Sequence, residues 1–272
     1  MEQSFSKPFA EMRYHDFVYM TAPVIPFTHC FTTRLGGVSE GCFESLNLGE
    51  NRGDKPQSVL ENYRIVREAM QIEGKPLCFT KQVHKTEVRI VTSADAREPF
   101  DPFLYEADGI VSNEQGLSLI CFSADCVPVL LCDPVAHVAG AIHCGWRSTV
   151  ADILGAAVEK MGMLGASPAN IHAAIGPGIE LCCFETGPEV AEGVRRLLGG
   201  DASEGTYFSV PGTGKFMVDL KETDHRRLMQ LGLAEENISV SDECTSCNSD
   251  KYWSHRKTGA KRGTQAALIV VG

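Results

Sequence analysis

Three apolar runs that follow one another with only short polar turns between them constrain the fold of this chain most strongly. They span residues 117–122, 127–132 and 137–143 of the 272-residue sequence. Their composition is typical of buried strands, and Asp and Pro stand in the turns. Because these connections are too short to hold a helix, we expect antiparallel pairing between neighbouring runs in place of a regular βαβ winding.

The remaining segments add strands and a few amphipathic helices. Strands are predicted at 17–20, 77–80, 87–92, 171–176, 216–220 and 267–271, and helices at 56–72, 149–161, 188–198 and 220–231. The glycine-rich passage 199–214 is predicted to be a surface loop. No linker or repeat divides the chain. We therefore predict a mixed α/β (α+β) protein of layered mixed β-sheets flanked by helices, with residues 1–272 forming one domain.

Charge and hydropathy exclude several classes of protein. Lys and Arg number 25 against 35 Asp and Glu, which argues against a nucleic-acid partner but not against a small phosphorylated ligand. No apolar run reaches the roughly 18–20 residues of a membrane helix. The N-terminal segment MEQSFSKPFAEMRYHDF lacks the basic-then-apolar order of a signal peptide. We expect a soluble cytoplasmic protein with no membrane partner.

Two histidines and a cysteine stand where predicted strands end. His84 follows the strand at 77–80, Cys126 lies in the turn after 117–122, and His143 ends the run 137–143. Two imidazoles and one thiolate form a borderline-soft ligand set, and three protein ligands with an open fourth position are typical of catalytic zinc. These three residues are the predicted catalytic and metal-binding site. Each of them taken singly also fits an ordinary structural role.

Three arginines are candidates for binding an anionic substrate. Arg34 precedes a Gly-Gly pair, Arg147 lies near the start of a predicted helix, and Arg256 follows Trp253. A guanidinium can hold an anion through two parallel hydrogen bonds, although solvated surface arginines are more common. Asp125, beside Cys126, is expected to orient a ligand or relay a proton.

The cysteines outside this trio carry a weaker signal. Cys244 and Cys247 form a single CxxC pair, and a structural zinc site needs a second pair. Cys182 and Cys183 are adjacent, which is a poor spacing for that role, and we expect them to contribute packing. The chain lacks the glycine-rich fingerprints of dinucleotide and P-loop sites.

The sequence resembles the laccase-domain family, named as multicopper polyphenol oxidoreductases and later described as zinc-dependent purine nucleoside phosphorylases. The matching blocks, in order along nearly the whole chain, are 29–39 (HCFTTRLGGVS), 45–49 (SLNLG), 82–84 (QVH), 107–109 (ADG), 124–131 (ADCVPVLL), 143–147 (HCGWR), 175–179 (IGPGI), 182–185 (CCFE) and 254–256 (SHR). The sequence departs from the family pattern at Cys30, Cys144, Ser148 and Phe184, and again around Arg262.

The resemblance implies that His84, Cys126 and His143 are the metal-ligating catalytic residues. It further implies phosphorolysis of adenosine, inosine and methylthioadenosine, with adenosine deaminase activity as an additional reaction of the same site. Zinc is the expected metal and copper the alternative. Purine nucleosides and phosphate are the expected partners.

Three other functions stay open on the sequence alone. A copper-dependent polyphenol oxidase is one, although the 8 histidines form no H-x-H pair of the multicopper type. A metal-free hydrolase with Cys126 as nucleophile and a histidine as base is the second. A non-catalytic redox or metal-binding module that uses Cys244 and Cys247 is the third.

Overall fold

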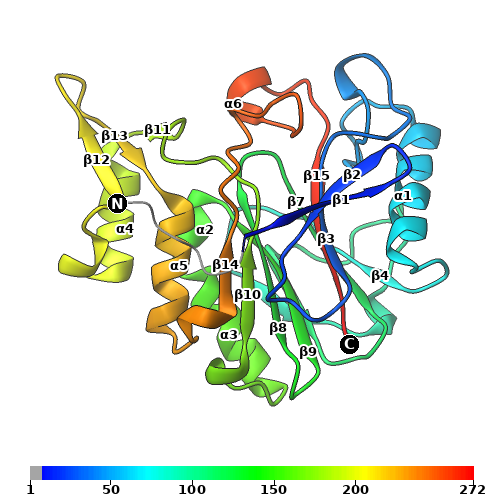
Figure 1. Cartoon of the computed structure of the whole chain (residues 1–272), viewed down its shortest axis with the longest axis horizontal. Coiled ribbons are helices and arrows are strands. Elements are labelled where there is room, and N and C mark those ends of the chain that lie inside the picture. Colours follow the sequence, from blue (N-terminus) through cyan, green and yellow to red (C-terminus); the bar gives the residue numbers. More distant parts are fainter. Residues whose placement is uncertain (1–7) are drawn as a thin grey trace.

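Two six-stranded sheets packed face to face form the centre of the protein (Figure 1). The computed structural model describes residues 8–272. Residues 1–7, which begin the segment inspected for a signal peptide, lie outside the described residues. Within residues 8–272, no helix is both long enough and apolar enough to cross a membrane. The predicted fold class, layered mixed sheets flanked by helices, is confirmed.

The first sheet places the last strand of the chain near its middle. Its pairs are antiparallel except β4 with β7. In spatial order it contains β1 (Ala10–Tyr14), β2 (Phe17–Thr21), β3 (His29–Thr32), β15 (Gln265–Val270), β7 (Ser118–Ser123) and β4 (Leu77–Cys78).

The second sheet carries parallel pairs at both edges, β10 with β14 and β5 with β6, around an antiparallel centre. Its order is β14 (Ile238–Val240), β10 (His172–Ile175), β8 (Val127–Asp133), β9 (Val138–Cys144), β6 (Gly109–Ser112) and β5 (Val88–Ile90). A small third sheet joins β11 (Glu185–Thr186), β13 (Lys215–Val218) and β12 (Tyr207–Val210).

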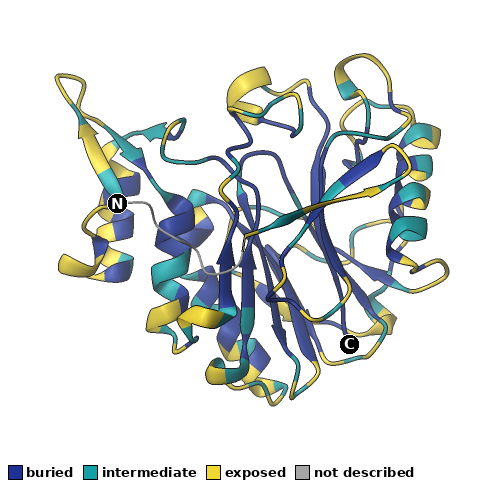
Figure 2. Cartoon of the chain, in the orientation of Figure 1, coloured by how far each residue is buried: buried dark blue, intermediate teal, exposed yellow. Residues whose placement is uncertain are grey.

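Helices cover both outer faces, so the molecule has four layers. Figure 2 shows the central strands of the two large sheets buried and the exposed residues concentrated on the outside. Helix α1 packs on the first sheet, and α2 to α5 pack on the second. The helices are α1 (Pro56–Met70), α2 (Trp146–Val150), α3 (Ile153–Met163), α4 (Pro188–Leu198), α5 (Leu220–Gln230) and α6 (His255–Thr258). Short 3-10 turns lie at Gly41–Phe43, Ser93–Asp95, Pro168–Asn170, Asp201–Ser203 and Glu235–Asn237.

Strand β15 illustrates why the central strands have continuous apolar sequences. Ala267 and Ile269 point into the core between the two sheets, whereas Ala266, Leu268 and Val270 point into the core under α1. Successive side chains of a strand point to opposite faces, so a strand buried on both faces needs apolar residues at every position.

The predicted pairing of the three central runs was wrong in one respect. Strands β8 and β9 form the expected antiparallel pair, with Val127 opposite Cys144. Strand β7 pairs instead with β15 and β4 in the other sheet. The turn between β7 and β8 therefore crosses from one sheet to the other, which lets the apolar faces of both strands close the core between the sheets. This crossing turn contains Cys126.

Two further predictions needed correction. The predicted helix 149–161 is divided into α2 and α3, because Asp152 adopts a left-handed conformation (φ 70°) and caps α3 by accepting a hydrogen bond from the backbone of Gly155. The passage 199–214, predicted as a loop, contains strand β12. The helices predicted at 56–72, 188–198 and 220–231 are confirmed as α1, α4 and α5.

Candidate metal centre

His84, Cys126 and His143 converge although they lie far apart along the chain. Their ligand atoms all lie within 4.8 Å of one another. The Cys126 Sγ is 3.7 Å from His84 Nε2, and the centroids of the two imidazole rings are 4.8 Å apart. The predicted convergence of these three side chains is confirmed. Their role as metal ligands stays a prediction.

Three different backbone arrangements bring the trio together. His84 follows β4 and has a left-handed backbone (φ 60°). Cys126 belongs to the turn that crosses between the sheets, directly after Asp125 (φ 91°). His143 lies on β9, just before the strand ends. Positive φ values are costly outside glycine and often occur at functional sites, which agrees with the location of this cluster.

Asp108 organises two members of the trio. One of its carboxylate oxygens accepts hydrogen bonds from the backbone N–H of His84 and from His143 Nδ1, both at 2.9 Å. The other accepts from the backbone N–H groups of Val83 and Lys85. Because Nδ1 of His143 faces Asp108, Nε2 is the nitrogen left for a metal. Asp108 is almost fully buried, and its pKa is nevertheless lowered, because these donors outweigh the cost of burial.

Replacing Asp108 with asparagine should therefore weaken metal binding. An amide would turn an N–H group toward one of its present donors and would remove the charge that favours the correct His143 orientation. Loss of such a partner typically lowers metal affinity about 10- to 100-fold. Zinc titration against a competing chelator would measure the change. Asp133→Asn is the matched control, because Asp133 is also buried and accepts backbone hydrogen bonds from Val135, Ala136 and Ser167. Zinc affinity equal to that of the wild type in Asp108→Asn would contradict this assignment.

Cys126 and His143 form an ion pair of a thiolate and a protonated imidazole, and a metal would displace the proton from His143. Burial alone would raise the pKa of the Cys126 thiol, but the two neighbouring imidazoles lower it to about 6. Burial opposes protonation of His143, yet the Cys126 thiolate and Asp108 raise its pKa to about 9. Cys126 is therefore a thiolate at neutral pH, which is the form that ligates metals and also the form that acts as a nucleophile.

Because Gly145 has no side chain, the His84 ring and the Cys126 sulfur can lie close to its backbone. A Cβ atom at this position would lie 2.8 Å from Cδ2 of His84 and 3.3 Å from the Cys126 sulfur. Any side chain at this position would therefore push against the His84 ring. The glycine between β9 and α2 is thus a steric requirement of the site.

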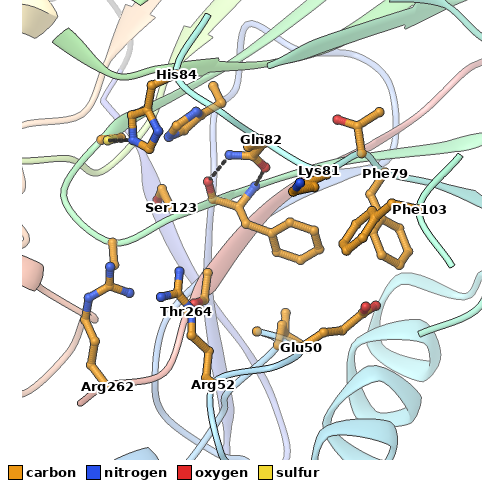
Figure 3. A pocket seen from close by; sticks show the side chains of 17 residues that line it. Glu50, Arg52, Phe79, Lys81, Gln82, His84, Phe103, Ser123, Arg262 and Thr264 are labelled. Atoms are coloured by element: carbon orange, nitrogen blue, oxygen red, sulfur yellow. Dashed lines mark hydrogen bonds between the residues drawn. The ribbon is translucent and has the colours of Figure 1, made fainter. Parts of the chain in front are cut away.

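The cluster lies where two cavities meet. The first has a volume of about 230 Å³ and the second about 370 Å³. Both are lined by Arg52, His84, Ala124, Cys126 and Arg262. The first continues past Phe79, Phe103 and Phe122 (Figure 3), and the second continues past Trp146, Phe184 and Arg256. A small molecule bound across both would pass the sulfur of Cys126.

Arg52 and Arg262 give the junction of the cavities a positive charge. Figure 3 shows both side chains extending into the cavity from the side opposite His84. Arg262 is buried, and among the described residues its Nε has no hydrogen-bond partner. Burial and the neighbouring Arg52 charge lower the pKa of Arg262 to about 10, so it still carries a proton at pH 7. Two guanidinium groups held near each other, one with a free buried donor, form a site for an anion.

The arginines chosen from the sequence lie in different places. Arg34 donates from all three guanidinium nitrogens to the backbone carbonyls of Glu44 and Ser249, and it stacks on Trp253. Arg147 is exposed on α2 and stacks on Trp146. Neither lines the two cavities. Arg256 lines the second cavity.

Asp125 has a structural partner on each oxygen. It accepts hydrogen bonds from the Thr245 hydroxyl at 2.7 Å and from the backbone N–H of Arg256 at 2.6 Å. Its carboxylate thus ties the crossing turn to the segment around α6. The carboxylate that contacts members of the trio is that of Asp108. The role predicted for Asp125, orienting a ligand or relaying a proton, stays a prediction.

Sequence reasoning missed Asp108, Arg52 and Arg262. The only signal for Asp108 was its place in one of the blocks that resemble the laccase-domain family. Arg262 appeared only as a departure from the family pattern, and Arg52 lies in an ordinary polar loop. Nothing in the local sequence of Arg52 or Arg262 indicates that both line the same cavities.

The four-layer fold, with a His/Cys/His cluster at the junction of two cavities, defines a small-molecule enzyme with a candidate soft-metal centre. Residues 28–272 match the family described as multi-copper polyphenol oxidoreductase laccase, and the chain belongs to this family.

Relatives of known name support the same grouping. The chain is 35% identical over 244 residues to purine nucleoside phosphorylase YlmD of Bacillus subtilis, a match that covers 88% of this chain and 86% of that protein. It is 34% identical over 256 residues to purine nucleoside phosphorylase of Deinococcus radiodurans, covering 92% and 91%. The crystal structure of YlmD from Geobacillus stearothermophilus superposes with a TM-score of 0.90 at 29% identity, covering 97% of this chain and 99% of that one.

Proposed function

We propose that this protein is a purine nucleoside phosphorylase that cleaves adenosine, inosine and methylthioadenosine with phosphate. The observation that carries the proposal is the pair Arg52 and Arg262 beside the His84/Cys126/His143 cluster, at the junction of two cavities. An anion site next to a candidate metal centre is what a reaction between phosphate and a nucleoside requires. The names of the relatives agree with this assignment.

The cavities offer suitable surroundings for both substrates. Phe79, Phe103 and Phe122 line the first cavity and provide apolar surface for a flat purine. Arg52 and Arg262 would hold phosphate at the junction, and Arg256 would extend the positive charge into the second cavity. We propose these three arginines as the substrate contacts in place of Arg34 and Arg147, because neither Arg34 nor Arg147 lines either cavity.

Phosphorolysis requires that phosphate be bound and directed toward C1′ of the ribose and that the departing base be protonated. A phosphate oxygen forms a bond to C1′ of the ribose, the bond from C1′ to the purine nitrogen breaks, and the departing base takes up a proton. The two guanidinium groups would bind the phosphate, offset the repulsion between its charges and orient one oxygen toward C1′. The apolar walls would limit the access of water, which competes with phosphate as the nucleophile.

His84, Cys126 and His143 would hold the metal, and we propose zinc with copper as the alternative. Two imidazoles and a thiolate fit either ion, whereas the absence of paired H-x-H histidines disfavours a multicopper oxidase. When bound, zinc supplies a Lewis acid that stabilises developing negative charge. Metal analysis of protein purified without added copper separates the two choices.

Incubation with adenosine, inosine and methylthioadenosine, with and without phosphate, tests the proposed reaction. We expect release of the free base together with a sugar 1-phosphate, and only when phosphate is present. Base release that does not need phosphate would indicate a hydrolase. Conversion of adenosine to inosine without release of base would indicate the deaminase reaction, and oxygen uptake with phenols would indicate the copper oxidase.

We also propose that the protein acts in the cytoplasm as one catalytic domain over residues 1–272. All eleven cysteines are free thiols. Two of them, Cys182 and Cys247, are exposed with sulfurs 3.5 Å apart, and such a pair would be prone to oxidation outside a reducing compartment.

A further inference from the structure

Four cysteines from two distant segments form a second cluster that the proposed reaction does not use. Cys182, Cys183, Cys244 and Cys247 place their sulfurs within 4.8 Å of one another. The sulfurs of Cys182 and Cys247 are 3.5 Å apart, those of Cys183 and Cys247 are 3.4 Å apart, and those of Cys182 and Cys183 are 3.8 Å apart. The sequence-based view that Cys182 and Cys183 are too poorly spaced to partner the CxxC pair was therefore wrong.

The topology of the second sheet brings the two pairs together. Strands β10 and β14 are parallel neighbours, so the segments that follow them leave the same edge of the sheet (Figure 1). A backbone bridge joins Gly178 to Cys244, and the N–H of Thr245 donates to the carbonyl of Gly178. Cys182 and Cys183 lie in the turn just beyond this bridge.

Hydrogen bonds fix the backbone on both sides of the cluster. The N–H groups of Cys183 and Phe184 both donate to the carbonyl of Glu180, which closes the first turn. The N–H and the side-chain amide of Asn248 both donate to the carbonyl of Cys244, which closes the second. The four thiols are thus presented by two rigid turns, and their proximity does not depend on long flexible side chains.

The sulfur separations match tetrahedral coordination of one ion. Zinc binds thiolate sulfur at about 2.3 Å, which places neighbouring ligands of a tetrahedral site about 3.8 Å apart. A disulfide would need about 2.05 Å between two sulfurs. Four thiolates in this arrangement select zinc or iron–sulfur chemistry, and a cluster of several irons would spread the four sulfurs more widely than the contacts found here.

We propose that Cys182, Cys183, Cys244 and Cys247 bind a second zinc ion with a structural role. Four protein ligands leave no open position on the ion, which distinguishes this site from the three-ligand centre of His84, Cys126 and His143. Cys182 and Cys247 are exposed and Cys244 is buried, so the ion reaches the site from solvent and is held against the body of the protein.

The ion would fasten the two segments that border the second cavity. Thr245, next to Cys244, donates to Asp125, the neighbour of Cys126. Arg256 donates from its guanidinium to the carbonyl of Cys183 and from its backbone N–H to Asp125. Through these contacts the four-cysteine site would position Asp125 and Arg256, which line the second cavity, without touching a substrate.

A buried lysine already joins the same two segments. Lys221 on α5 is buried and donates to the Glu180 carboxylate and to the carbonyls of Ser241 and Glu243. The Glu180 carboxylate balances the positive charge of Lys221, so the contribution of Lys221 is to join the two segments.

Metal content of the full-length protein, purified under reducing conditions and measured by mass spectrometry, tests the proposal. We expect about two zinc ions per chain for the wild type. We expect about one for the double variant Cys244→Ser/Cys247→Ser, and about one for Cys126→Ala, which loses only the other centre. Cys42→Ser is the matched control, because Cys42 is an exposed free thiol outside both clusters, and it should retain two.

Cobalt substitution gives a second readout that does not depend on activity or on the folding of the Cys244→Ser/Cys247→Ser double variant. Cobalt-loaded Cys126→Ala should keep the strong thiolate-to-cobalt absorption of a tetrahedral four-sulfur site. Absence of this absorption, or a disulfide among the four cysteines in freshly reduced protein, would overturn the proposal. So would equal zinc content in the wild type and in the folded double variant. None of these outcomes depends on whether the enzyme is a phosphorylase.

Discussion

Cys126→Ala, and separately His143→Ala, should lower kcat/KM for phosphorolysis of inosine and adenosine at least about 10³-fold. This corresponds to about 4 kcal/mol of lost transition-state stabilisation. Each change removes one of three ligand atoms that lie within 4.8 Å of one another, and no other member of the cluster can replace it. Steady-state kinetics with each nucleoside, together with circular dichroism to verify folding, would measure the effect.

Cys144→Ala is the matched control for these variants. Cys144 follows His143 on β9 and is fully buried, but it points into the core beneath the helices. It should retain activity close to that of the wild type. Retained turnover in Cys126→Ala or in His143→Ala would refute the assignment of the trio.

Chelation distinguishes a metal enzyme from a metal-free Cys–His hydrolase. Both mechanisms need the Cys126 thiolate, so the alanine variant alone does not separate them. Removal of metal should abolish activity, and zinc should restore it. Full activity after metal removal, combined with loss of activity on alkylation of Cys126, would favour the hydrolase.

Arg262→Gln should raise the KM for phosphate and lower kcat/KM about 10²-fold, or about 2.7 kcal/mol. The guanidinium is buried and faces the junction of the cavities with an unpartnered Nε among the described residues, so a neutral amide loses both the charge and the donor geometry. Varying phosphate at saturating inosine would measure the change. The KM for the nucleoside should change much less.

Arg34→Gln is the comparison for Arg262→Gln. Its guanidinium donates to the carbonyls of Glu44 and Ser249, so its loss should lower thermal stability while leaving the KM for phosphate close to that of the wild type. A larger effect on phosphate binding in Arg34→Gln than in Arg262→Gln would show that the anion binds elsewhere.

The secondary structure was largely predictable because its signals are local. The signals for β8 and β9 are their apolar runs, and the signal for α4 is the helical spacing of its apolar residues. Both kinds of signal depend on neighbouring residues alone. The sheet to which β7 belongs was not predictable in this way. Its partner β15 is far from it along the sequence, and an apolar run carries no signal of which sheet it joins.

Among the residues of the candidate site, only those whose type is uncommon at strand ends could be predicted from the sequence. Imidazoles and a thiolate at strand ends are unusual enough to be noticed, so His84, Cys126 and His143 could be chosen before their convergence was known. Arginines are common on surfaces, and only tertiary packing separates Arg262, which borders the cavity, from Arg34, which supports a loop.

The central position of β15 has a consequence for biosynthesis. Phe31 on β3 and Ala267 on β15 are cross-strand neighbours, so the first sheet cannot be completed until the ribosome has translated the final strand. Strand β7, which leads into the turn with Cys126 and pairs with β4 on one side, gains its second neighbour at the same moment. Until β15 has been made, β3 and β7 each lack the neighbour that lies between them in the sheet, which leaves unpaired, aggregation-prone edges on the nascent chain.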